Sequence, residues 1–66
     1  MKPAEVRALP IGALLRRYDG DYLVVDKDER RVLIEANTLM SGIRRTYRSW
    51  YAIDNESFFL EMERIA

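Results

Sequence analysis

One stretch decides the fold, residues 13–25, which reads ALLRRYDGDYLVV. At its centre stands Asp19-Gly20, a pair whose members both tolerate positive φ, as the two-residue type I′ turn of a β-hairpin requires. The flanking residues 13–18 and 22–25 are rich in the apolar and aromatic side chains typical of strands. The stretch therefore predicts a β-hairpin with Asp19 and Gly20 at the two central positions of its turn.

Beyond the hairpin the chain continues as a meander. The polar residues 26–30 turn it into a third strand, residues 31–36, which is rich in β-branched side chains. Residues 37–42 are then expected to form a loop that carries the apolar residues Leu39 and Met40 at its tip.

The fourth predicted strand, residues 43–53, separates two kinds of side chain. Its odd-numbered positions form a mainly apolar face, and its even-numbered positions form a mainly polar face that includes Trp50. Because the strand is long, we expect a bulge or a strong bend within it, near Ser49.

The C-terminal segment fits two patterns. The apolar spacing from residue 58 onward suits a short helix and an alternating strand equally well. Our prediction combines them as one helical turn over residues 55–59, capped by Asp54 or Asn55, and a short strand over residues 60–65.

Residues 1–10 are expected to be an N-terminal extension, either one short turn of helix or an extended segment. Residues 11–66 then form a single small domain whose predicted core is drawn from all five strands and the helical turn. Its members are Leu15, Tyr22, Val24, Val32, Ile34, Tyr47, Tyr51, Ile53, Phe58 and Met62.

This outline resembles the Src-homology-3-like small β-barrel. The resemblance lies in Gly12 before the first strand, in Asp19-Gly20, and in residues 51–53 leading into residues 55–59. It implies an all-β, five-stranded antiparallel SH3-like barrel with one short helical turn before the last strand. The acidic loop and proline-binding groove of the signalling domains are missing, and so is the glycine-rich basic loop of nucleic-acid-binding barrels, so neither role carries over.

Composition excludes several kinds of chemistry. The chain has no cysteine and no histidine, which rules out disulfides, thiolate chemistry and histidine-based catalysis. The acidic residues between positions 19 and 29 lack the spacing of a calcium-binding loop. We therefore expect no enzyme, no metal site and no cofactor.

Arginine is interleaved with aromatic residues in the fourth strand. Arg44, Arg48 and Trp50 share its even-numbered face, an arrangement typical of single-stranded nucleic-acid platforms. The competing interpretation is a solvated strand whose arginines pair with Glu56, Glu61, Glu63, Asp26 or Glu29. The formal net charge of zero favours this second interpretation, because it removes long-range attraction to a phosphate chain.

Residue types common at protein interfaces are also frequent. Nine of the eleven basic residues are arginine, and the chain carries tyrosine, tryptophan and exposed-looking apolar positions beside them. The predicted function is a non-enzymatic binding module that contacts a protein or a second copy of itself, with nucleic-acid binding as the alternative. The predicted partner-binding residues are Arg44, Arg48, Trp50, Leu39 and Met40.

No apolar run is long enough to span a bilayer, and the N-terminal residues lack the apolar centre of a signal peptide. We therefore expect no membrane partner and a cytoplasmic location. The outline also resembles small bacterial and phage-type proteins of unknown function, which implies a small accessory or regulatory protein of that type.

Overall fold

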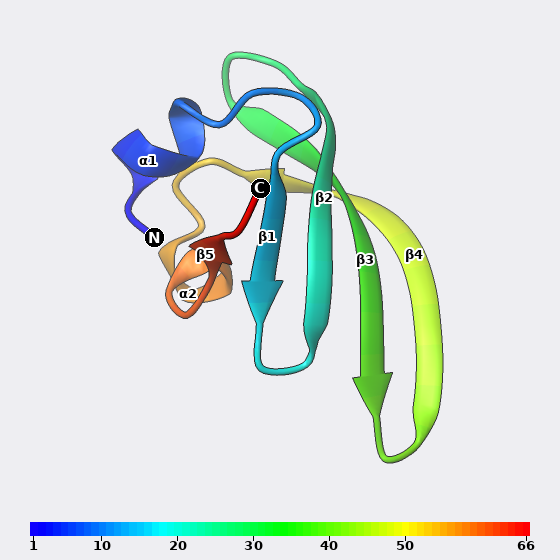
Figure 1. Cartoon of the computed structure of the whole chain (residues 1–66). Helices are drawn as coiled ribbons and strands as arrows, with labels where there is room; N and C mark the ends of the chain where they lie inside the picture. Colours follow the sequence, from blue (N-terminus) through cyan, green and yellow to red (C-terminus); the bar gives the residue numbers. More distant parts are fainter.

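The computed structural model describes residues 1–66 as one open sheet of five antiparallel strands with two short helices beside it (Figure 1). The helices are α1 (Pro3–Arg7) and α2 (Glu56–Phe59). The strands are β1 (Leu14–Arg17), β2 (Gly20–Lys27), β3 (Arg31–Met40), β4 (Ile43–Ala52) and β5 (Glu63–Arg64). In the sheet order β4-β3-β2-β1-β5, β4 and β5 are the two edge strands, each paired on one side only. The predicted five antiparallel strands are therefore confirmed, in a sheet that is not closed.

The turn of the first hairpin lies one residue earlier than predicted. Arg17 pairs with Gly20, so Tyr18 and Asp19 are the two central residues, and neither has a positive φ. Gly20 is needed for a different reason. Its φ is +151°, and a Cβ there would overlap the carbonyl oxygen of Asn37 on the neighbouring strand. The glycine thus permits close approach of β2 to β3 rather than the turn itself.

The type I′ turn is found in the second hairpin instead. Ser41 and Gly42 have φ of +52° and +78°, and they connect Met40 to its partner Ile43. Positive φ at both central residues defines this turn type. The prediction of a loop over residues 37–42 is therefore wrong, because most of that segment continues strand β3.

The bulge lies in β2 rather than in the fourth strand. The register of β2 against β3 shifts between Val24 and Asp26, which leaves Val25 without a partner. In contrast, β3 and β4 pair without interruption from Arg31↔Ala52 to Met40↔Ile43. No bulge is therefore present near Ser49, and β4 instead follows a strong bend (Figure 1).

Helix α2 begins where a cap was predicted. The side chain of Asn55 accepts a hydrogen bond from the Phe58 N–H at 3.2 Å, so Asn55 is the N-cap rather than Asp54. The helix is anchored from the other end of the chain, because the Met1 amino group donates to the Phe59 carbonyl at 2.9 Å. The following strand β5 is shorter than expected and pairs only with β1.

The core lies between one face of the sheet and the two helices. Seven of the ten predicted core residues are buried, namely Leu15, Tyr22, Val24, Val32, Ile34, Ile53 and Met62. Tyr51 and Phe58 are only partly buried against this core, and Tyr47 is 42% exposed, so its placement in the core was wrong. The remaining buried side chains are Val6, Leu9, Ala13, Ala36, Thr38 and Phe59. Residues 1–10 thus contribute Val6 and Leu9 to the core.

Candidate functional site

The β3–β4 hairpin extends beyond the rest of the sheet (Figure 1). Pairing between β2 and β3 ends at Gly20↔Thr38, whereas β3 and β4 remain paired as far as the turn. Residues 39–44, which we call the distal hairpin, therefore pair only with each other. One backbone hydrogen bond, from the Leu39 N–H to the Asp19 carbonyl at 2.9 Å, ties its base to the first hairpin.

The predicted partner-binding residues do not share one face. Residues directly opposite in an antiparallel pair point to the same side, and successive residues alternate. Leu39, Arg44, Arg48 and Trp50 consequently lie on the outer face, away from the core, as the pairs Leu39↔Arg44, Glu35↔Arg48 and Leu33↔Trp50 show. Met40 lies on the opposite, inner face.

The inner face of the distal hairpin is apolar and exposed. Met40 is 54% exposed and its partner Ile43 is 59% exposed. Tyr47 lies on the same face closer to the core, beyond the pair Thr38↔Arg45. These side chains continue the surface that Ile34 and Ala36 present to the core. No element of the chain covers this continuation.

Sequence reasoning missed Ile43 and Tyr47 because it placed the apolar face of β4 inside the core. The available signal was the pair Ser41-Gly42 between two apolar residues, which marks a tight turn. A tight turn there puts Ile43 beside Met40 at the tip of a hairpin, rather than at the start of a buried strand.

Two of the residues predicted to bind nucleic acid are already engaged within the fold. Arg48 forms an ion pair with Glu35, with Nε 2.9 Å from the carboxylate. The guanidinium of Arg31 lies 4.6 Å from the Trp50 ring centroid, in a cation–π contact that covers one ring face. The acidic residues named as partners in the sequence interpretation form no ion pair with β4.

The other two arginines of β4 have no acidic partner. Arg44 donates only to the side-chain oxygen of Asn37, at 3.3 Å, and Arg45 makes no side-chain hydrogen bond or ion pair. Strand β4 contains three arginines and no acidic residue, so the open edge of the sheet that it forms carries positive charge.

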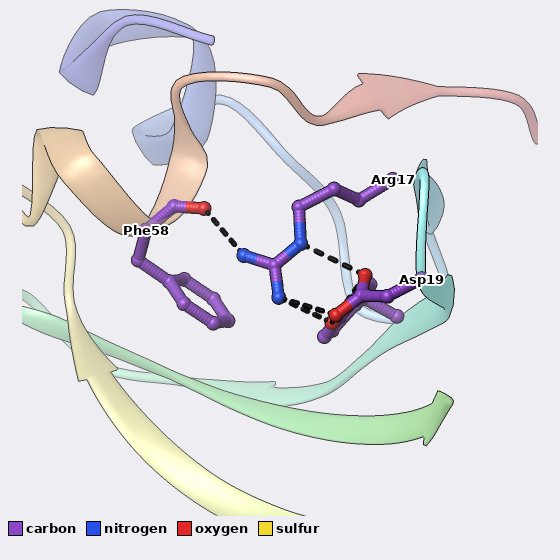
Figure 2. Close-up of polar contacts among 4 residues, drawn as sticks. Arg17, Asp19 and Phe58 are labelled. Carbon is purple, nitrogen blue, oxygen red and sulfur yellow. Dashed lines mark hydrogen bonds and ion pairs between the residues drawn. The ribbon is translucent and has the colours of Figure 1, made fainter. Parts of the chain in front are cut away.

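A second polar arrangement, unforeseen in the sequence, joins the first hairpin to α2. Arg17 donates to both carboxylate oxygens of Asp19, at 2.9 and 2.7 Å, and to the Phe58 carbonyl at 3.4 Å (Figure 2). The Tyr22 hydroxyl donates to Asp19 at 2.8 Å and accepts from Arg17 at 2.7 Å. The guanidinium also lies 5.4 Å from the Phe58 ring centroid.

This network shifts the pKa values of its members. The hydrogen bond from Arg17 holds the pKa of Asp19 below its ordinary value. Burial, followed by the hydrogen bond to Asp19, raises the pKa of Tyr22. Each polar group has a partner inside the network, so its role is to fasten α2 to the sheet rather than to bind a ligand.

The acidic residues between positions 19 and 29 are dispersed. Asp19 and Asp21 pair with Arg17 and Arg16, and Asp28 accepts from backbone and side chain of Arg31. No group of three or more acidic side chains is arranged to hold a metal ion.

A depression of about 870 Å³ lies between α1, the β2–β3 turn and residues 52–54. Its charged lining is balanced, since it consists of Arg7, Arg30, Arg31, Asp28, Glu29 and Asp54. Arg7 donates to the Glu29 carbonyl at 3.0 Å. With no excess charge and two apolar residues in its wall, the depression selects no class of ligand.

No helix of the chain has the length and apolar character needed to cross a membrane. Comparisons of the chain with models of protein families, with curated proteins and with solved structures give no match.

Proposed function

We propose that this protein is a non-enzymatic accessory or regulatory module of bacterial or phage type, which acts in the cytoplasm by binding another protein. The observation that carries this proposal is the distal hairpin, a projecting arm where Met40 and Ile43 lie side by side on the inner face and Leu39 lies on the outer face, each more than half exposed. Contiguous exposed apolar side chains on a small protein mark interaction sites.

The energetics of the hairpin support a covered state. A two-stranded hairpin has marginal stability in water when nothing packs against it. Burial of apolar surface contributes about 25 cal/mol per Å², so a partner that covers Met40 and Ile43 stabilises the arm and gains affinity together. The arm has no catalytic group beside it, which is why binding, rather than chemistry, is the proposed role.

For the scaffold we propose an SH3-like barrel type. Four meandering strands, a single turn of helix at α2 and a short β5 that returns to β1 agree with this outline. In this interpretation the protruding β3–β4 hairpin is an extension of the barrel that carries the binding surface.

The alternative is a nucleic-acid-binding barrel that uses residues 43–53. The ion pair of Arg48 with Glu35 and the contact of Arg31 with Trp50 favour protein binding over this alternative. Both contacts occupy groups that a single-stranded nucleic acid would need.

The proposal is tested by affinity capture from nuclease-treated lysate of the source cells, with the protein immobilised. The double variant Met40→Ser, Ile43→Ser should lose the specific partner. The matched control is Ile11→Ser, Leu60→Ser, which removes two apolar side chains of similar exposure (60% and 69%) far from the hairpin.

Circular dichroism melting shows that both double variants are folded before capture is compared. Loss of the same partner from both variants, or retention by both, would contradict the assignment of the hairpin as the binding surface. Material that is captured only when nuclease is omitted would favour the nucleic-acid alternative.

A further inference from the structure

Strand β4 forms a long open edge of the sheet. It pairs with β3 along all ten residues and with nothing on its other side. It contains no proline and no bulge, and no helix or loop covers it. An edge of this kind presents a row of unpaired backbone groups to which another strand can be added.

The backbone groups at this edge can be identified. The Ile53 N–H donates to the Arg30 carbonyl at 2.9 Å, and the two-residue turn closes on Met40↔Ile43. Hydrogen-bonded and non-hydrogen-bonded pairs alternate in an antiparallel ladder, so the odd-numbered residues of β4 bond to β3. The groups that point to the open edge belong to the even-numbered residues, which are Arg44, Thr46, Arg48, Trp50 and Ala52.

The charge of the edge selects its partner. A second copy in antiparallel pairing would place three arginines of each β4 along the shared edge, with no acidic residue in either strand. Like charges across a ladder are destabilising, whereas opposite charges stabilise it. The edge therefore disfavours self-pairing and favours an acidic strand.

The two faces of the edge set the side-chain pattern of that strand. On the outer face, a residue added beside Arg44 meets unpaired positive charge, whereas Arg48 is already paired with Glu35. On the inner face, residues added beside Ile43 and Tyr47 meet exposed apolar side chains, and a residue added between them meets the unpaired charge of Arg45. A strand that complements this edge places acidic residues beside Arg44 and Arg45, and apolar residues beside Ile43 and Tyr47.

We infer that β4 binds an extended segment of a partner protein, with acidic residues beside Arg44 and Arg45 and apolar residues beside Ile43 and Tyr47, as a sixth strand of the sheet. This inference rests on the proposed function and specifies the partner's chemistry. The acidic side chains lie against Arg44 and Arg45, and the apolar ones cover Ile43 and Tyr47.

The experiment uses a peptide of about eight residues, a usual strand length, that contains the run Val-Thr-Glu-Glu-Val. In antiparallel pairing its valines lie opposite Tyr47 and Ile43, and its glutamates lie opposite Arg45 and Arg44. Amide hydrogen exchange of the whole protein is followed by NMR with and without the peptide. In the free protein the N–H groups of Thr46 and Arg48 should exchange fast, while those of Tyr47 and Ser49 are protected. The peptide should slow exchange at Thr46 and Arg48 by roughly tenfold or more.

Charge is tested with a second peptide that carries lysine in place of glutamate, and with Arg44→Glu. This variant should bind the glutamate peptide roughly five- to tenfold more weakly and the lysine peptide more tightly. Arg30→Glu is the control, because Arg30 is exposed, lies beside the opposite end of β4 from Arg44 and forms no side-chain ion pair.

Several outcomes would overturn the inference. One is peptide binding without protection of Thr46 and Arg48, and another is an equal response of Arg44→Glu and Arg30→Glu. Protection of the edge that rises with protein concentration in the absence of peptide would identify a second copy instead. If capture of a partner depends on Met40 and Ile43 while the edge stays unprotected, the proposed function stands and the added strand does not.

Discussion

Gly20 and Gly12 both have positive φ but differ in their surroundings. A Cβ at Gly20 would overlap the backbone of Asn37 and lie 2.8 Å from Thr38 Cα, whereas nothing lies within 4 Å of the same position at Gly12. We expect Gly12→Ala to lower the free energy of unfolding by about 1 kcal/mol, through backbone strain alone. Gly20→Ala adds a steric conflict with β3, and its loss should reach ~3 kcal/mol.

Urea unfolding of the two variants measures this difference directly. The comparison separates strain from overlap, because both positions carry a conformation unfavourable to alanine and only one has a neighbour to displace. Equal losses in the two variants would show that β2 and β3 do not approach each other as closely as the structure places them.

The Arg17–Asp19 network predicts a dependence of stability on pH. The pKa of Asp19 is lower in the folded chain than its unfolded value of about 3.9. The network therefore stabilises the folded chain fully at pH values above the unfolded pKa, and this stabilisation is lost as the pH falls through the lower folded pKa. For Tyr22 the folded pKa is raised above about 10, so stability is also lost in alkali, once tyrosine ionises in the unfolded chain.

Asp19→Asn should lower the free energy of unfolding at neutral pH by roughly 2 kcal/mol, because two charge-assisted hydrogen bonds are weakened. It should also flatten the decline in acid. The control is Asp26→Asn, at an exposed carboxylate that accepts only from the Lys27 N–H. Urea unfolding across the pH range is the measurement, and an acid decline of unchanged steepness in Asp19→Asn would remove Asp19 from this role.

At the scale of elements, the correct predictions concern features that depend on residues close together in the sequence. The apolar alternation of β2 and β3 and the side-chain cap of α2 depend on neighbours along the chain, and their buried residues and cap agree with expectation. The first turn does not depend on its own residues alone. Gly20 is required by Asn37 on another strand, and nothing in residues 13–25 reveals that contact.

The face of β4 shows a second limit of sequence reasoning. Ile43, Tyr47 and Tyr51 alternate as they would in a strand buried on one side, yet only Tyr51 packs against the core. Alternation reports that a face is apolar and does not report what covers it. The alternation therefore predicted a core position for Tyr47. The residues predicted to form one binding surface lie on two faces, because the Ser41-Gly42 turn pairs Met40 with Ile43.

At the scale of the whole molecule, the distribution of charge limits the affinity for nucleic acid. The formal net charge is zero, and the free positive charge of β4 is confined to Arg44 and Arg45 because Arg48 is paired. We expect single-stranded DNA and RNA to bind no more tightly than roughly the micromolar level of nonspecific binding near physiological salt. Trp50→Ala should cost less than the ~1–3 kcal/mol of a stacking platform, since Arg31 covers one face of the ring.

Fluorescence anisotropy of labelled single strands tests this expectation, with the salt dependence recorded beside the affinity. A platform that neutralises phosphates would show affinity falling with salt at a logarithmic slope of about −0.7 per phosphate contacted. Binding well below micromolar concentration that disappears in the double variant Arg44→Ala, Arg48→Ala would identify β4 as a nucleic-acid-binding surface. Weak binding that this double variant leaves unchanged would agree with the proposed sheet edge, where arginines of β4 contact acidic side chains of a protein strand.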